Sequence, residues 1–297
     1  MSKENKKVKF FSLEFQENYV DKFFNKDKFK KILERLFLSE IEDRMLPRDS
    51  NKNYKALLLK DWERVNDFTY KLLFNSCRYN FSPNLISSLD ATERPSDKKM
   101  YEGEKEKTHM ILNINKNEVL VIMENNSTGV SITQLVYYFN NFFDSSFIFP
   151  DKDHRCKIIY SIIPSEGFRE ALSNTKRIRM AEIFTTKKSL GSEFRNNMDR
   201  EGGFMREDIL LTLRAERKES LLPRMIENFF NKYSSSGSEI NRIRIYGKDK
   251  EDNKIKLDTK TFEKTEYINT QINENGTVNS DSIFSSLEKI LDNFIDE

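Results

Sequence analysis

Arginine side chains recur, two residues apart, in two segments that alternate basic and apolar residues as a β-strand does. Arg177 and Arg179 are spaced this way in RIRMAEIF, and Arg242 and Arg244 in NRIRIYGK. Because side chains two residues apart on a strand point to the same face, each pair is expected to present its guanidinium groups together. Paired guanidinium groups are a chemistry that binds phosphate, so the pattern indicates a nucleic-acid-binding surface.

A third basic cluster lies where an expected strand over 207–216 gives way to an expected helix. Arg214, Arg217 and Lys218 crowd this junction, and the helix is expected to begin near Ser220. A helix start adds backbone N–H donors and a positive dipole end, which suit a phosphate group. From the residues alone, the competing interpretation is a solvated strand face whose cations pair with nearby Asp and Glu.

The residues that usually carry catalysis or hold metals are scarce. The chain has two histidines, His109 at an expected strand start and His154 in a charged loop. It has no HExxH, GxSxG, GxGxxG or GxxxxGK[ST] motif. His154 and Cys156 could touch one metal ion, but nothing nearby completes a tetrahedral set. No catalytic residue, metal site or cofactor is therefore assigned.

One pattern resembles a metal-dependent nuclease. Asp208, Glu216 and Lys218 give D-x7-E-x-K around one strand, and nucleases use two carboxylates for Mg²⁺ with a Lys near the attacking water. At the rise of an extended strand the two carboxylates would lie roughly 26 Å apart, too far to share a metal ion. A nuclease using Glu216 and Lys218 is kept as the alternative function.

Composition bounds the class of protein. The 297 residues are 33% charged, yet they include 24 Phe and 11 Tyr, enough aromatic mass for hydrophobic cores. No apolar run is long enough to span a membrane, and the N-terminus lacks the apolar stretch of a secretory signal. The two cysteines, Cys77 and Cys156, have no paired spacing. These features predict a cytoplasmic protein with reduced thiols.

Charge is distributed unevenly although the net charge is only +2. Residues 151–250 hold 21 basic and 15 acidic side chains, and residues 251–297 hold 5 basic and 11 acidic ones. A basic region beside an acidic tail permits nucleic-acid binding through one face of the protein.

Hydrophobic periodicity predicts an α+β fold in two lobes. An N-terminal lobe is expected over 1–150 and a C-terminal lobe over 151–297, the latter with the basic strands and an acidic terminal helix. Each lobe is expected to have a mixed or antiparallel sheet with helices packed on one face. The charged segment 88–107 has no apolar period and is expected to form a loop.

The most distinct local unit spans residues 108–143. Two apolar strands, 108–114 and 118–125, are joined by Asn-Lys-Asn, which indicates a hairpin. Ser131 follows as an expected helix N-cap with Gln134 as its capping-box partner. A strand, turn, strand and helix in this order are typical of an α+β lobe.

The central and C-terminal segments resemble a known family. LTLRAERKESLLPRMIENFF, and later IRIYGKDKEDNKIKLDT, are similar to the RexA-like phage-exclusion proteins of lambdoid prophages. EVLVIMENNSTGVSITQLVYYFN, a strand followed by Gly-Val-Ser and a helix, is similar to bacterial abortive-infection proteins. The resemblance covers residues 108–270 and rests on short motifs.

This resemblance implies a two-lobed α+β homodimer that binds DNA with little sequence specificity. Members of the family act as the sensing arm of a phage-exclusion system and pair with a membrane effector protein. The basic cluster of the family falls on Arg217 and Lys218, with Arg214 before them. This sequence differs from the pattern in placing Glu216 and Glu219 beside the pair.

The sequence therefore predicts a homodimeric, non-enzymatic DNA-binding protein of antiphage defence. The expected DNA-binding residues are Arg177, Arg179, Arg214, Arg217, Lys218, Arg242 and Arg244. A third possible function, beside the nuclease, is a protein–protein adaptor that docks a partner through its acidic helix over 281–297.

Overall fold

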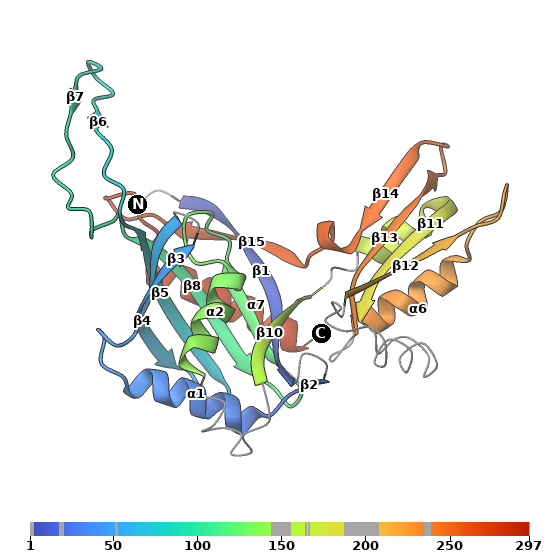
Figure 1. Ribbon diagram of the computed structural model, residues 1–297, viewed down its shortest axis with the longest axis horizontal. Coiled ribbons are helices and arrows are strands. Elements are labelled where there is room, and N and C mark those ends of the chain that lie inside the picture. The colour runs from blue at the N-terminus through green and yellow to red at the C-terminus, as the bar shows by residue number, and fades with distance from the viewer. Residues whose placement is uncertain are drawn as a thin grey trace, which may run out of the picture.

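The computed structural model describes residues 3–17, 21–50, 53–143, 156–163, 165, 167–186, 208–234 and 239–296. These residues form two large antiparallel sheets with helices packed against them and a short two-stranded sheet of β6 (Leu85–Ile86) and β7 (Glu93–Arg94), which confirms the expected α+β class (Figure 1). Within this part of the chain, every helix is too short or too polar to cross a lipid bilayer.

The large sheet is built around one long strand, β1 (Lys3–Glu17). Its order is β10-β1-β9-β8-β5-β4-β3, and β2 and β15 also pair with β1. The other strands are β2 (Asp21–Phe23), β3 (Met45–Ser50), β4 (Asn53–Arg64), β5 (Thr69–Arg78), β8 (Glu106–Ile114), β9 (Val119–Glu124), β10 (Cys156–Ile162) and β15 (Thr265–Gln271). The expected hairpin is confirmed as β8 and β9, paired from Met110–Met123 to Ile114–Val119.

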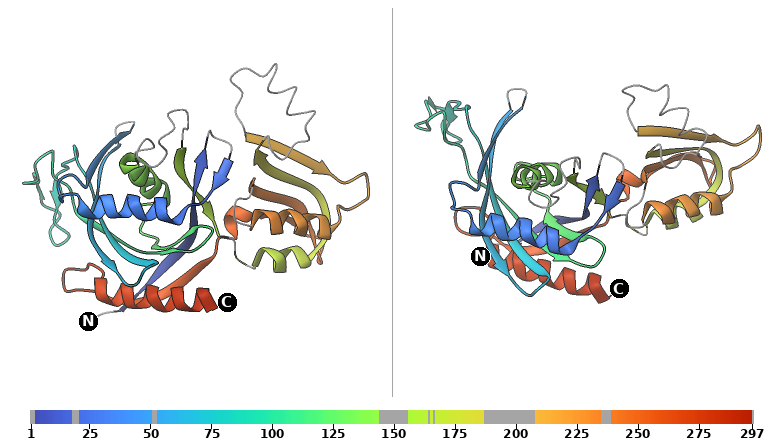
Figure 2. Two further views of the ribbon diagram at one scale, coloured as in Figure 1. Left: turned by 90° about the horizontal axis from the view of Figure 1, so that it is seen from below. Right: turned by 60° about the horizontal axis from the view of Figure 1, so that its bottom comes forward.

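Helices cover both faces of the large sheet. Phe11, Leu13 and Phe15 of β1 pack in the core under α1 (Lys26–Leu38) and α2 (Ile132–Phe142). Val8 and Phe10 alternate with them and pack against α7 (Ser280–Asp296) on the other face (Figure 2). Helices were expected on one face only. β9 is buried along its whole length. A strand that is buried on both faces needs apolar side chains from other elements on both sides of the sheet.

The small sheet has the order β12-β11-β13-β14, from β11 (Thr175–Thr186), β12 (Asp208–Arg214), β13 (Ile240–Asp249) and β14 (Lys254–Asp258). Two helices, α4 (Gly167–Ser173) and α6 (Pro223–Tyr233), cover one face. The rings of Phe168 and Phe230 stack between them, with centroids 4.6 Å apart. A short 3-10 helix over Thr259–Thr261 follows β14.

The chain does not pass from the large sheet to the small sheet at residue 150, which was the expected boundary between the two lobes. β10 was expected in the second lobe, but it pairs with β1 from Phe11–Ile162 to Glu17–Cys156. β15 pairs with the first half of β1, and α7 packs beneath it. The small sheet is therefore inserted between β10 and β15. A strand of 15 residues is long enough to hold two partners end to end along one edge.

Local helix signals give two different outcomes. The capping box of Ser131 and Gln134 is present at the start of α2 and confirms the prediction. Ser220 was expected to cap α6, but the N-cap is Leu222, which makes no side-chain cap. The hydroxyl of Ser220 instead accepts a hydrogen bond from the backbone N–H of Ile178 at 2.9 Å. Pro223 at the first helical position needs no N–H acceptor, so α6 begins there.

Candidate nucleic-acid interface

The face of the small sheet opposite α4 and α6 carries rows of side chains defined by the strand register. One row runs Arg214, Met180, Tyr246 and Lys256 across the four strands. The adjacent row at one end pairs Arg177 with Lys248 and Lys254. The adjacent row at the other end runs Thr212, Glu182, Arg244 and Asp258. Cations therefore concentrate at the end near the β13–β14 turn.

Arg242 and Arg244 lie at the opposite end, where carboxylates engage them. Nη1 of Arg244 is 2.8 Å from Oε2 of Glu182, and Nε is 3.1 Å from Oδ2 of Asp258. Arg242 forms a bidentate hydrogen-bonded pair with the same Asp258. Both guanidinium groups also lie over the ring of Phe184, at 5.2 and 5.3 Å from its centroid. This arrangement is an ion-pair network that joins three strands.

The network shifts the ionisation of its members. Burial raises the pKa of Asp258, but hydrogen bonds from Arg242 and Arg244 outweigh burial and lower that pKa to about 2. The hydrogen bond to Asp258 in turn raises the pKa of Arg244. The charges of the two arginines are thus balanced within the sheet, so these residues contribute little to attracting an external phosphate.

Arg177 and Arg179 do not form the expected matched pair. The register of β11 against β13 shifts between Ile178 and Met180, as at a β-bulge, which breaks the two-residue alternation. Arg179 is exposed. Arg177 is half-buried, and its Nε donates to the carbonyl oxygen of Glu219 at 3.0 Å. Arg177 therefore holds the loop that follows β12.

That loop presents Arg217 and Lys218 to solvent. The N–H of Glu219 donates to the carbonyl of Glu216 at 3.0 Å, which closes a turn with Arg217 and Lys218 at its two central positions. Lys218 has a φ of 74°, the left-handed conformation found at such turns. Both side chains are exposed. The N–H of Leu221 donates to the carbonyl of Ile178 at 2.9 Å and fixes the loop against β11.

Three lysines of the β13–β14 hairpin join this surface, although they are not among the DNA-binding residues expected from the sequence. Lys254 and Lys256 are exposed on β14, and Lys248 is half-buried on β13. The signal was present, because Lys254 and Lys256 alternate with apolar residues in KIKLD as the arginine pairs do. Only the register shows that they share a face with Arg214.

The tip of the hairpin is held by its own carboxylates. Oδ1 of Asp249 accepts hydrogen bonds from the backbone N–H groups of Glu251 and Asn253, both at 2.9 Å. Asp252 lies 2.9 Å from Nζ of Lys176 and 3.8 Å from Nζ of Lys248. The hydrogen bond from Lys176 lowers the pKa of Asp252. These contacts order the lysine-bearing strands beside the tip.

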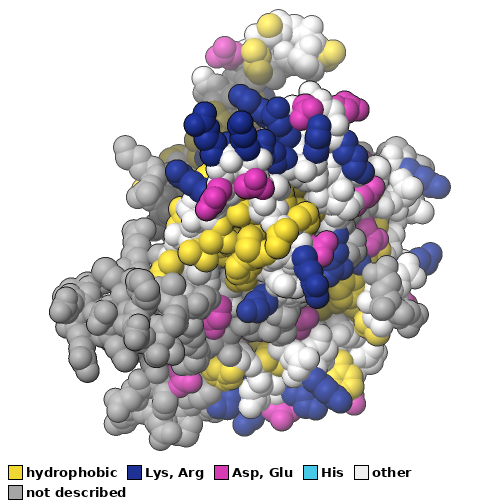
Figure 3. All heavy atoms as spheres, turned by 90° about the vertical axis from the view of Figure 1, so that its right-hand side faces the viewer, with side chains coloured by type: hydrophobic (Ala, Val, Ile, Leu, Met, Phe, Trp, Pro, Cys, Tyr) yellow, Lys and Arg dark blue, Asp and Glu magenta, His cyan; other side chains and the backbone are white. Residues whose placement is uncertain are grey.

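We call the surface formed by Arg179, Arg214, Arg217, Lys218, Lys248, Lys254 and Lys256 the basic end of the small sheet. Seen from the side of the molecule that carries this sheet, Lys and Arg side chains gather in a band above an apolar strip, with a few acidic groups between them (Figure 3). Three strand spacings separate Arg214 from Lys256, or about 14 Å. That span matches the approximately 12 Å width of a DNA major groove.

The nuclease pattern remains dispersed. Asp208 begins β12, and Glu216 follows its end, as expected for carboxylates too far apart to share a metal ion. Within the described ranges, no three His, Cys, Asp or Glu side chains are grouped closely enough to hold a metal ion. His154 lies outside these ranges. Cys156 is half-buried on β10 and, like Cys77, is a free thiol.

His109 is fully buried in the large sheet. Its Nδ1 lies 2.8 Å from Oε2 of Glu124, and its Nε2 lies 2.9 Å from the hydroxyl of Ser280, the first residue of α7. The ring of Phe284 lies nearly perpendicular to the imidazole, at an interplanar angle of 81° and with ring centroids 5.2 Å apart. The three polar groups join two strands to a helix.

The chain matches no protein family model, and no curated protein resembles it significantly in sequence.

Proposed function

We propose that this protein binds DNA through the basic end of the small sheet, with little sequence specificity. The observation that supports the proposal is the segregation of charge on one sheet face. Arg242 and Arg244 are neutralised by carboxylates at one end. At the other end, Arg179, Arg214 and the Arg217–Lys218 turn are exposed.

Binding would come from cations that replace the counterions of the phosphate backbone. Such binding is sequence-independent and weakens steeply as salt is added. Phe168 and Phe230 of the two covering helices are buried in the core, and the half-buried rings of Phe184 and Tyr246 on the sheet already lie beneath Arg and Lys side chains. Stacking on bases therefore has little part in the proposal, which favours a duplex over a single strand.

The resemblance to RexA-like proteins supports a role in antiphage defence for this proposed binding. The protein would act as a DNA sensor in a phage-exclusion system, together with a membrane effector protein. This biological role rests on the resemblance, whereas the proposed binding surface rests on the arrangement of the cations.

Reversal of the two turn cations tests the binding surface. Arg217→Glu with Lys218→Glu should leave the fold intact, because both side chains are exposed and their reversal costs about 0.5 kcal/mol or less. Fluorescence anisotropy with a labelled duplex should show that affinity falls by at least tenfold at low salt. Lys31→Glu with Lys60→Glu is the matched control. It makes the same change of charge at exposed positions on α1 and β4 and should bind as the wild type does.

Equal binding by the double reversal and the wild type would contradict the proposal. The same protein preparation, incubated with plasmid DNA with and without Mg²⁺, tests the nuclease alternative. Metal-dependent cleavage that Glu216→Gln abolishes would favour the nuclease. For the adaptor alternative, the apolar side of α7 is already used, since Ile283, Leu287 and Leu291 are buried against the large sheet.

A further inference from the structure

A serine, a histidine and a glutamate of the large sheet are joined in a line by two hydrogen bonds. Nε2 of His109 lies 2.9 Å from Oγ of Ser280, and Nδ1 lies 2.8 Å from Oε2 of Glu124. A hydroxyl held against an imidazole whose other nitrogen faces a carboxylate is the arrangement that activates the nucleophile of serine hydrolases. This arrangement recurs on unrelated folds and is recognised by its geometry, whatever the order of the residues in the chain.

The burial of the three groups differs in the way that such chemistry needs. His109 is fully buried and Glu124 is 3% exposed, on the neighbouring strands β8 and β9. The interaction between them is therefore not weakened by water. Ser280 is half-buried at the start of α7, so its hydroxyl lies on the side of the imidazole that solvent and small molecules can reach.

The carboxylate sets the role of each imidazole nitrogen. A neutral imidazole has one N–H donor and one acceptor nitrogen. Because Glu124 only accepts, it holds the proton on Nδ1, and Nε2 then presents its lone pair to the hydroxyl of Ser280. His109 can thus take the hydroxyl proton as a general base. Glu124 acts through His109, since it orients the ring and stabilises the imidazolium that forms.

The start of α7 supplies donors for the charge that develops on a substrate. The side chain of Asn279 accepts from the N–H of Ser282 at 2.9 Å, and its carbonyl accepts from the N–H of Ile283 at 3.2 Å. Among the described residues, the backbone N–H groups of Ser280 and Asp281 have no hydrogen-bond partner. Two N–H groups beside the serine, at the positive end of a 17-residue helix, suit an oxyanion.

We propose that Ser280 and His109, positioned by Glu124, form the catalytic centre of an esterase. Oγ of Ser280 bonds to the carbonyl carbon of a carboxylic ester while Nε2 of His109 takes the hydroxyl proton. The carbonyl oxygen becomes an oxyanion bound by the two N–H groups. The bond from the carbon to the ester oxygen then breaks, and the proton on Nε2 leaves with the alcohol. Water, deprotonated by Nε2, attacks the acyl-serine, the carboxylic acid is released, and the proton returns to Oγ.

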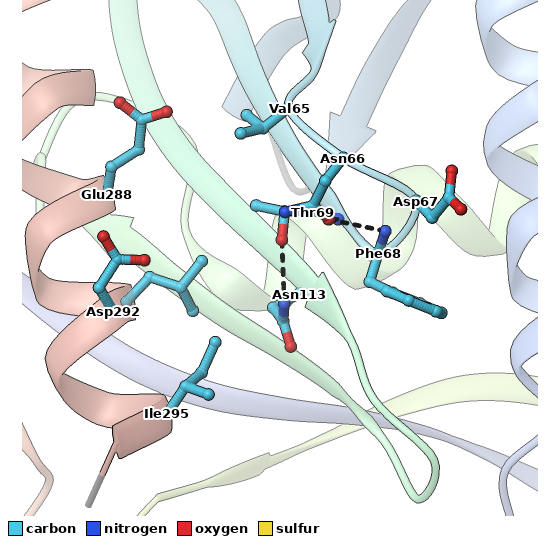
Figure 4. Close-up of a pocket in the computed structure, with 10 residues that line it drawn as sticks. Val65, Asn66, Asp67, Phe68, Thr69, Asn113, Glu288, Asp292 and Ile295 are labelled. Atoms are coloured by element: carbon cyan, nitrogen blue, oxygen red, sulfur yellow. Dashed lines mark hydrogen bonds between the residues drawn. The ribbon is translucent and has the colours of Figure 1, made fainter.

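The surroundings of Ser280 favour a small ester without negative charge. A cavity of about 740 Å³ lies between α7 and the β4–β5 turn, where Glu288 and Asp292 of the helix line it (Figure 4). At the rise of an α-helix these two residues are about 12 and 18 Å beyond Ser280, too far to hold the acyl group of a short ester. Asp281 is exposed beside the nucleophile, and its carboxylate would repel an anionic substrate.

Reaction of the full-length protein with a fluorophosphonate tests the nucleophile. Oγ of an activated serine displaces fluoride from phosphorus, so mass spectrometry should find one adduct per chain, on Ser280. Protein unfolded in urea should not react, because the imidazole is then no longer beside the hydroxyl. Ser280→Ala should not react. Ser285→Ala, at an exposed serine of the same helix, is the control and should react as the wild type does.

Glu124→Gln tests the positioning of the imidazole. Gln has the same shape but no charge, so it cannot stabilise the imidazolium. With p-nitrophenyl acetate as substrate, kcat should fall by about a hundredfold or more while KM stays nearly unchanged, a split that a loss of stability alone would not produce. Asp292→Asn, which removes one exposed carboxylate from α7, is the control and should alter neither constant.

Ser280→Cys separates activation of the nucleophile from folding, because the thiol can still hydrogen-bond to His109. The imidazole should take the thiol proton, so iodoacetamide at pH 6 should modify the introduced thiol rapidly. Ser285→Cys places an ordinary thiol on the same helix and should react at least about tenfold more slowly at that pH. Native Cys77 and Cys156 are present in both variants as a common background, and mass spectrometry distinguishes the sites.

Five results would overturn the proposal: no adduct on the native protein, an adduct on another serine, an unchanged kcat in Glu124→Gln, equal reactivity of the two introduced thiols, or hydrolysis of p-nitrophenyl acetate no faster than by Ser280→Ala. Ester hydrolysis does not depend on DNA binding, because the cations proposed to bind DNA lie on the small sheet. Arg217→Glu with Lys218→Glu should therefore leave the fluorophosphonate adduct and kcat unchanged, which distinguishes a failure of one proposal from a failure of the other.

Discussion

Nδ1 of His109 lies 2.8 Å from the carboxylate of Glu124, and both side chains are buried on neighbouring strands of the large sheet. The backbone N–H of His109 donates to the same carboxylate oxygen at 3.3 Å. A carboxylate only accepts, so Nδ1 donates to it, and Nε2 shares a second hydrogen bond with the Ser280 hydroxyl. The pair thereby ties the start of α7, which is distant in sequence, to the sheet.

Ser280→Ala should destabilise the protein by about 1–3 kcal/mol, because it leaves the buried Nε2 of His109 without its hydrogen-bond partner. Urea unfolding followed by circular dichroism measures the change. Ser285→Ala, at an exposed position of the same helix, should be nearly neutral. Equal stability of the two variants would show that the hydroxyl of Ser280 does not anchor α7.

Phe139→Asp should prevent the large sheet from folding. Phe139 is fully buried in α2, where its ring meets that of Phe29 at 5.9 Å, and an unpaired charge there costs several kcal/mol. Tyr137→Asp is the matched control on the same helix, since Tyr137 is 41% exposed. Expression, solubility and melting temperature distinguish the two. A soluble Phe139→Asp variant with unchanged melting would mean that this face of α2 is exposed in solution.

Asp258 should make stability depend on pH in the acid range. Its pKa is lowered to about 2 from an ordinary value of 3.8, so the contribution is present above about pH 4 and is lost as pH falls through about 2. The shift corresponds to about 2 kcal/mol. Asp258→Asn should remove that contribution and flatten the loss of stability between pH 4 and pH 2. Asp43→Asn, at an exposed residue of the large-sheet region, should not alter the profile.

Lys254→Gln with Lys256→Gln should reduce the salt dependence of DNA binding. Each lost phosphate contact lowers the slope of log affinity against log salt by about 0.9. For the double variant, the slope of log affinity against log salt should therefore be smaller by between one and two per chain. Its affinity should be reduced to the same extent for duplexes of different sequence. Lys31→Gln with Lys60→Gln is the control for the loss of charge. An unchanged slope would exclude β14 from the interface.

Cys77 and Cys156 should be dispensable and slow to react. Burial raises the pKa of the Cys156 thiol to about 11 and also raises that of Cys77, so few thiolates form at neutral pH. Iodoacetamide should modify both cysteines much more slowly in the folded protein than in urea. Replacement of both by Ala should preserve folding. Rapid labelling of native protein would indicate that one of these sites opens readily.

Local elements could be predicted from the sequence because short-range patterns determine them. The β8–β9 hairpin, the Ser131 and Gln134 capping box, and the amphipathic helix that begins at Lys26 all depend on residues that lie close together in the sequence. The exposure of Arg217 and Lys218 also followed from their place between a strand and a helix.

Pairing between strands that are distant in sequence decided how the sheets are arranged. The alternation of apolar and polar residues within a strand does not specify which other strands pair with its edges. β10, β15 and α7 join the large sheet through β1 and its core, so the small sheet is an insertion. Register likewise placed Asp258 and Glu182 beside Arg242 and Arg244, which are 14 to 62 residues from them in sequence. The sequence by itself determined which residues carry charge and which strands alternate. Only the tertiary structure decided which of those charges are balanced inside the sheet and which are exposed at its surface.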